Sequence, residues 1–248
     1  MAAEFHLLCA GAVKGLVLAV QPAFESAAGV RLRAQFGAVG AMRDALGAGA
    51  ACDAFVATEA MIGSLVASGA LRVGSSAAIG RVQTGIAVRA DQPLPAIDSA
   101  ATLKSTLLAA EAVYLPDAER STAGAHFVAV LGRLAIRATL ARRLRIYPNG
   151  AAAMRELAAA SEPTAIGCTQ ATEICYTPGL VLVGALPPPF ALATVYSGAV
   201  ATAASDDSVA RHLIELLAGA GSAALRSAGG FDAIADDASS ADRNGRRG

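Results

Sequence analysis

Four short runs of small residues are the parts of this sequence best suited to chemistry. They are Gly11-Ala12, Gly37–Gly40, Ser121–Gly124 and Asn149-Gly150, and each leads from an apolar strand-like run towards a helical pattern. A turn without bulky side chains leaves backbone N–H groups accessible, and the positive end of the following helix dipole points to the same place. Because this combination suits anions, the sequence predicts a bound oxyanion or carboxylate.

Three titratable side chains, two beside these turns and Glu59 at the exit of the third strand, are candidates for acid–base work or charge neutralisation. His126 lies one turn into the helix expected from Ser121, where the dipole favours a neutral imidazole that can act as a base. A half-buried structural histidine is the alternative. Glu59 either reaches the ligand or only stabilises the start of its own helix. Lys14 either neutralises a bound carboxylate or lies in solvent.

Five further residues lie in or directly after predicted strands. Arg89 could hold a carboxylate through two parallel hydrogen bonds, or form a salt bridge at a hinge. Gln170 is expected to contact the ligand, and Tyr196 could place a hydroxyl near the hinge. Cys9 and Cys168 could face each other across a cleft, although buried reduced thiols are the simpler interpretation.

Composition limits the classes of function. The chain has 248 residues, of which 54% are hydrophobic and 4% aromatic, with no Trp, and its 20 basic residues balance 20 acidic ones. This charge balance predicts no nucleic-acid partner. No metal-ligand spacing links the four cysteines, no cofactor motif occurs, and no apolar run predicts membrane insertion. Because the sequence shows no secretory signal, a cytoplasmic location is expected, or a periplasmic one if a signal was removed.

Apolar runs that alternate with helical patterns predict an α/β protein with two Rossmann-like lobes around central mixed sheets. The expected strands are 5–10, 30–36, 52–57, 82–89, 112–115, 144–147, 165–169, 180–183 and 193–200. Lobe I is predicted to comprise 1–81 and 195–232, and lobe II to be inserted as 82–194. The tail 233–248 is rich in Asp, Ser, Arg and Gly, and is expected to be disordered.

Several motifs together resemble the type II periplasmic-binding-protein fold, in its molybdate-binding-protein-like branch. They are CAGAVKGL, FGAVGAMRDAL with ACDAFVATEAM, TGIAVRADQPLP, STAGAHFVAVLGRL, IGCTQATEI, GLVLVGALP and ATVYSGAV, in order from about residue 5 to 231. The resemblance implies two lobes that close over a ligand cleft at the hinge.

Three positions depart from the molybdate-binding pattern. The resemblance implies serines in the first two turns, where this chain has Ala12 and Val39, and a tyrosine where it has Gln170. Alanine and valine cannot donate a side-chain hydrogen bond, and an oxyanion oxygen left without a donor costs about 1–3 kcal/mol. We therefore expect an organic carboxylate in preference to molybdate.

Within this family the chain is similar to the branch of proteins that handle small organic acids, which includes the aconitate-isomerase-like proteins. The resemblance implies either a non-catalytic binding protein, with an ABC transporter permease as partner only if exported, or an isomerase of a small unsaturated di- or tricarboxylate. His126 is the predicted catalytic residue. The predicted ligand-binding residues are Gly11, Ala12, Val13, Lys14, Ala38, Val39, Thr58, Glu59, Arg89, Ser121, Thr122, Ala123, Asn149, Gly150, Gln170 and Tyr196.

Overall fold

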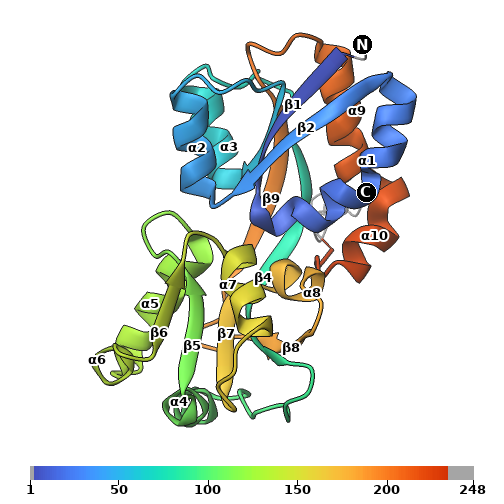
Figure 1. Ribbon diagram of the computed structural model, residues 1–248. Coiled ribbons are helices and arrows are strands. Elements are labelled where there is room, and N and C mark those ends of the chain that lie inside the picture. Colours follow the sequence, from blue (N-terminus) through green and yellow to red (C-terminus); the bar gives the residue numbers. More distant parts are fainter. Residues whose placement is uncertain (1–2, 234–248) are drawn as a thin grey trace, which may run out of the picture.

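Two α/β lobes, joined by extended segments, make up the protein (Figure 1). A computed structural model describes residues 3–233, so that the tail expected to be disordered lies, apart from Ala233, outside the described residues. Within residues 3–233 no helix combines the length and hydrophobicity that crossing a membrane requires.

The sheet of lobe I has the strand order β2-β1-β3-β9-β4. Its strands are β1 (Ala3–Ala10), β2 (Val30–Gly37), β3 (Ala54–Thr58), β9 (Ala193–Val200) and the first half of β4 (Ala77–Arg89). The first three are parallel, whereas β9 runs antiparallel to β3 and β4. Its helices are α1 (Lys14–Ala28), α2 (Val39–Gly47), α3 (Glu59–Ala67), α9 (Asp207–Ala218) and α10 (Ala223–Ala228), with short 3₁₀ turns at Gly11–Val13 and Ala220–Ser222.

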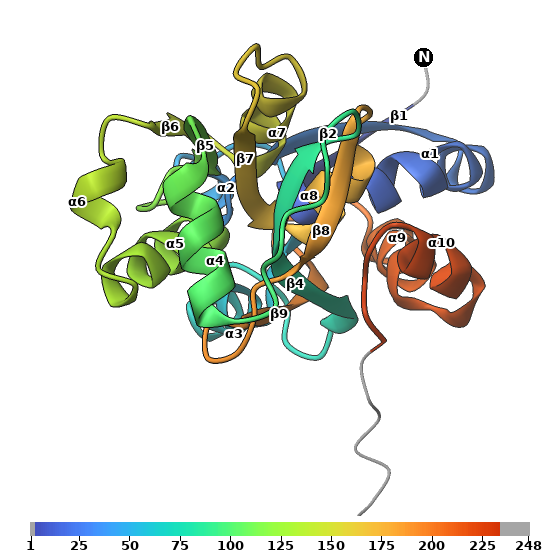
Figure 2. The ribbon, with the colours of Figure 1, turned by 90° about the horizontal axis from the view of Figure 1, so that it is seen from below.

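Lobe II contains the second half of β4 with β5 (Ala112–Pro116), β6 (Leu144–Tyr147), β7 (Ala165–Gln170) and β8 (Leu180–Ala185). Strands β5, β6 and β7 are parallel, and β4 is antiparallel to both β7 and β8. Its helices are α4 (Ala100–Ala109), α5 (Thr122–Arg133), α6 (Arg137–Leu140), α7 (Gly150–Ala158) and α8 (Ala171–Tyr176). In Figure 2, α4, α5 and α6 lie on the opposite side of this sheet from α7.

Strand β4 connects the lobes, because its partner changes along its length. Up to Gln83, which pairs with Ala193, it belongs to the sheet of lobe I, and from Thr84, which pairs with Gln170, it belongs to lobe II. The change falls two residues after the predicted boundary between 81 and 82. The chain returns through Pro187–Leu192, where the backbone of Leu192 accepts a hydrogen bond from Thr84.

Separate cores stabilise the lobes. One cluster in lobe I packs α1, α2 and α9 against the sheet through residues such as Leu7, Phe24 and Leu213. Lobe II has one cluster around Leu103 and Phe127 and another around Met154. Since burial of apolar surface is the main favourable contribution to folding, each lobe holds its strand ends in place independently of the cleft.

Gly124 on α5 gives a testable prediction about lobe II. A Cβ at this position would overlap the carbonyl oxygens of Pro116 and Asp117, which belong to the backbone and cannot move aside easily. Gly124→Ala should therefore lower the free energy of unfolding by about 1–3 kcal/mol, as overpacking does. Gly132→Ala is the matched control, since the same helix leaves open space there, and it should stabilise by up to about 1 kcal/mol. Equal effects in urea denaturation would contradict the packing.

Candidate functional site

A cavity lies between the lobes, where the parallel strands of both sheets end and several helices begin. Its enclosed space is small, about 20 Å³, and reaches about 270 Å³ when the open solvent at its mouth is included. The lobes touch beside it, because the backbone N–H of Gly40 in lobe I donates to the carbonyl of Arg120 in lobe II at 3.0 Å. The lining residues are Ala10, Gly11, Ala12, Gly37, Ala38, Val39, Ser121, Thr122, Ala123, Gly150, Gln170, Glu173 and Tyr196.

Five helical segments begin at this cavity: the 3₁₀ turn at Gly11, and α2, α5, α7 and α8. The Ser121 side chain caps α5 by accepting from the N–H of Gly124 at 3.3 Å. The first N–H groups of a helix have no partner inside the helix, and the dipole adds positive potential there. Among the described residues no Lys or Arg lines the cavity, so these helix starts are its main source of positive potential.

Gln170, the last residue of β7, carries an unsatisfied polar group into the cavity. Its side chain is 3% exposed, and neither Nε2 nor Oε1 has a hydrogen-bond partner among the described residues. An unpaired buried polar group lowers stability by about 1–3 kcal/mol. A ligand that forms hydrogen bonds with the Gln170 amide would remove this cost.

Glu173 on α8 is the carboxyl group of the cavity and is 7% exposed. Its Oε2 accepts a hydrogen bond from the Thr169 hydroxyl at 2.5 Å. The Glu173 carboxyl also forms hydrogen bonds with the backbone of Ala151 and Gln170. Burial nevertheless raises the pKa of Glu173, because desolvation of the charge outweighs these bonds. The carboxyl therefore stays protonated to a higher pH than an ordinary glutamate and can donate a hydrogen bond.

Two neighbours define the environment of Glu173. A side chain at Gly150, the first residue of α7, would overlap the Glu173 carboxyl, so glycine allows this helix to begin against it. Tyr196 on β9 is 2% exposed, and its pKa is raised by burial and further by the nearby charge of Glu173. Its phenol therefore keeps its proton and offers a donor to the cavity.

A second cavity, which we call the vestibule, adjoins the first. Gly11 and Gly37 line both spaces, and the vestibule is further lined by Lys14, Phe36, Asn149, Ala151, Arg155, Tyr176, Thr177 and Pro178. The Lys14 ammonium lies between two aromatic rings, 5.6 Å from the centroid of Phe36 and 5.5 Å from that of Tyr176. Asn149 caps α7 by accepting from the N–H of Ala152 at 2.9 Å.

Comparison with known proteins identifies the fold around these cavities. The family model of the bacterial extracellular solute-binding proteins matches residues 5–231. The chain belongs to this family. It is 28% identical over 220 residues to an aconitate isomerase from a Pseudomonas species, a match covering 86% of this chain and 81% of that protein.

Solved structures agree on the architecture. The periplasmic molybdate-binding protein of Azotobacter vinelandii superimposes with a TM-score of 0.77 at 16% identity, covering 93% of this chain and all of that one. The sulfate-binding protein SubI of Mycobacterium tuberculosis gives a TM-score of 0.74 at 17% identity, covering 94% and 88%. The chain thus has the type II periplasmic-binding-protein fold, which the sequence motifs predicted.

The predicted site residues divide into three groups. Those that line the cavity are Gly11, Ala12, Ala38, Val39, Ser121, Thr122, Ala123, Gly150, Gln170 and Tyr196. Lys14 and Asn149 line the vestibule instead. The remaining predicted residues, Val13, Thr58, Glu59, Arg89 and His126, line neither cavity.

Each residue of the last group has structural contacts elsewhere. Val13 is fully buried in the core of lobe I. Thr58 caps α3, of which exposed Glu59 is the first residue, consistent with the alternative that Glu59 stabilises its helix start. Arg89 donates to the carbonyls of Ala160 and Glu162 at 2.9 Å and forms an ion pair with Asp91. These contacts lie at the end of β4 away from the hinge, so Arg89 neither lines the cavity nor forms a salt bridge at the hinge.

His126 lies on α5 with its Nε2 2.7 Å from the carbonyl oxygen of Phe190, which belongs to the returning segment between the lobes. This contact corresponds to the structural alternative, and the predicted catalytic role of His126 has no support from its position. Cys9 and Cys168 are buried in different lobes, and burial raises the pKa of both thiols, which leaves them unreactive.

Sequence reasoning missed Glu173 and the vestibule residue Arg155. The short helix α8 was not predicted, so the acidic residue three positions after Gln170 was not placed in the cavity. A glutamate directly after a fully buried strand, in an otherwise apolar and small-residue stretch, is the signal that could have identified it.

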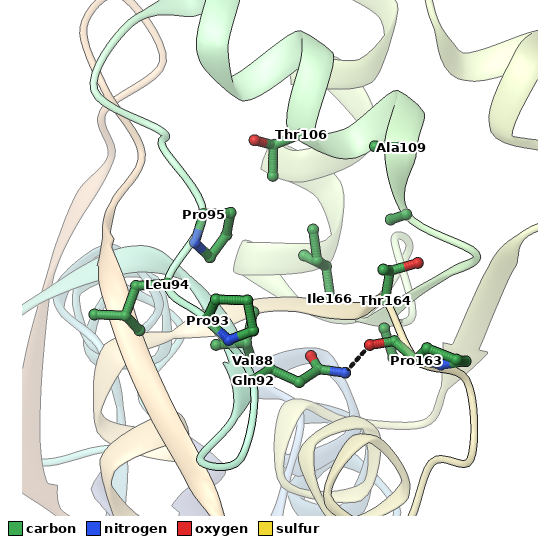
Figure 3. Close-up of a pocket in the computed structure, with 12 residues that line it drawn as sticks. Val88, Gln92, Pro93, Leu94, Pro95, Thr106, Ala109, Pro163, Thr164 and Ile166 are labelled. Atoms are coloured by element: carbon green, nitrogen blue, oxygen red, sulfur yellow. Dashed lines mark hydrogen bonds between the residues drawn. The ribbon is translucent and has the colours of Figure 1, made fainter.

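A third cavity lies at the opposite end of lobe II and differs in chemistry (Figure 3). Val88, Pro93, Leu94, Pro95 and Ile166 are among its lining residues, and no Lys, Arg, Asp or Glu of residues 3–233 lines it. The Gln92 amide donates to the carbonyl of Pro163 at its edge. This mostly apolar cavity suits an anion less well than the interlobe cavity, where several helices begin.

Proposed function

We propose that this protein binds a small organic carboxylate in the interlobe cavity, in preference to molybdate. The observation that carries the proposal is the Gln170 amide, which is buried in the cavity without a partner among the described residues. A carboxylate can accept from the amide N–H group and from the helix N-termini around it. Ala12 and Val39 line the same cavity and offer no hydroxyl to a tetrahedral oxyanion.

A thermal-shift series tests this proposal. Saturation at about 100 times Kd contributes about 2.7 kcal/mol, so a bound carboxylate such as aconitate should raise Tm by roughly 5–10 °C. Molybdate and sulfate at the same ionic strength should leave Tm close to that in chloride. A large shift with molybdate and none with carboxylates would overturn the proposal.

A second candidate function is isomerisation of an unsaturated di- or tricarboxylate. The similarity to an aconitate isomerase supports it, and so does the cavity carboxyl of Glu173, because burial raises its pKa and lets it hold a proton at a higher pH than an ordinary glutamate. Moving a double bond removes a proton from one carbon and returns a proton to another. A single carboxyl group that contacts both carbons could take the first proton, exchange it with solvent and return a solvent proton to the second carbon.

Proton NMR of aconitate incubated with the protein in deuterated water separates the two candidates. An isomerase would form the second isomer and incorporate deuterium at carbon, whereas a binding protein would leave the ligand unchanged. If the protein is a binding protein and is exported, we expect an ABC transporter permease as its partner.

A further inference from the structure

The vestibule beside the interlobe cavity contains two cationic side chains without acidic partners. Lys14 begins α1 in lobe I and Arg155 belongs to α7 in lobe II, so the pair comes from both sides of the cleft. Within residues 3–233 the arginine ion pairs involve Arg33, Arg43, Arg72, Arg81, Arg89 and Arg211, and neither vestibule side chain has a carboxylate oxygen within 4.0 Å. Two unpaired cations in one concave space favour an anionic group there.

The position of Lys14 is fixed by its surroundings. Its ammonium group lies near the rings of Phe36 from β2 and Tyr176 from α8, at distances typical of cation–π contacts. The aromatic rings hold the charge at the mouth of the cleft without neutralising it. A ligand therefore meets a positioned cation and does not have to order a free lysine side chain first.

The two spaces adjoin each other, so that one ligand can contact the lining of both. Gly11 and Gly37 line both, so no bulky side chain separates the inner cavity from the vestibule at these positions. The inner cavity has neutral donors and helix starts, and the vestibule has full positive charges. A ligand with a carboxylate in each space would use both sets of groups.

We propose that the vestibule is a subsite for a second carboxylate of the ligand, bound by Lys14 and Arg155. The protein then selects dicarboxylates and tricarboxylates over monocarboxylates and inorganic oxyanions. This inference rests on the proposed carboxylate-binding function and specifies the class of ligand.

Calorimetric titration of Lys14→Gln and Arg155→Gln with aconitate, succinate and propionate tests the subsite. Each substitution should weaken binding of aconitate and succinate by about 10-fold or more, as loss of a charge-assisted bond does, and change propionate binding less than 3-fold. Arg142→Gln is the control, since Arg142 is exposed and lines neither cavity. It should leave all three affinities unchanged.

The other outcomes distinguish failure of the subsite from failure of the proposed function. If both vestibule variants bind aconitate as tightly as the wild type, the subsite is wrong while the proposed function stands. Equal losses for propionate and aconitate would also overturn it, because a second-carboxylate subsite cannot act on a monocarboxylate. If the wild type binds none of the three acids, both the subsite and the proposed function fail.

Discussion

Replacing Gln170 by leucine is expected to stabilise the unliganded protein while weakening carboxylate binding by about 10- to 100-fold. The first effect follows because leucine removes two buried polar atoms that have no partner among the described residues, each at a cost of about 1–3 kcal/mol. The second follows because a hydrogen bond to a charged group contributes about 1.5–3 kcal/mol. Thermal unfolding without ligand and calorimetric titration with aconitate measure the two effects on the same samples.

Thr172→Val is the matched control for this experiment. The Thr172 hydroxyl is also buried without a partner among the described residues, but Thr172 does not line the cavity. Its replacement should raise stability and leave affinity unchanged. If Gln170→Leu keeps the wild-type affinity, the Gln170 amide does not contact the ligand and the main support for the proposed function is lost.

Glu173→Gln is expected to remove a pH dependence of stability and, if the protein is an isomerase, nearly all turnover. The folded-state pKa of Glu173 lies above its ordinary value of 4.5, because the buried charge is desolvated. Its contribution to stability is therefore complete below about pH 4.5 and is lost as pH rises through the folded-state pKa. Glutamine has no such proton, so the wild type should lose stability relative to the variant over this range.

The difference between the two melting curves as a function of pH isolates this group. Asp53, Glu4, Glu25 and Asp206 have lowered pKa values, act in the opposite direction and are present in both proteins. Loss of general acid–base catalysis should reduce isomerisation by about 10²- to 10⁴-fold, while aconitate still binds near neutral pH. A flat difference curve would contradict a raised pKa, and full turnover would remove Glu173 from the reaction.

The fold was predictable from the sequence because local signals agree with it. All nine predicted strands exist, and that at 193–200 has the predicted bounds. Helix α1 ends at Gly29, which adopts the left-handed conformation with φ 66° that favours glycine there. The small-residue turns mark the strand ends, which explains why eight of the ten predicted ligand-binding residues that line the cavity come from these turns.

The rest of the site depends on contacts that local patterns do not encode. Whether Arg89 reaches a ligand depends on where β4 ends relative to the cleft, and its carbonyl partners at 160 and 162 are about 70 positions away in sequence. His126 lies in the expected helix, but its side chain contacts the carbonyl oxygen of Phe190 and does not line the cavity. Glu173 was missed because α8 has only six residues, too few for a helical hydrophobic pattern.

The side-chain amide of Gln170 gives the most direct test of the central claim, that the interlobe cavity binds a carboxylate through this group. Its two N–H signals can be assigned in a ¹⁵N-correlated NMR spectrum as those missing from Gln170→Leu. Saturation with aconitate should move both signals and slow their exchange with water, whereas molybdate should leave them unchanged. Binding of aconitate with no change in these signals, or a response to molybdate alone, would contradict the account.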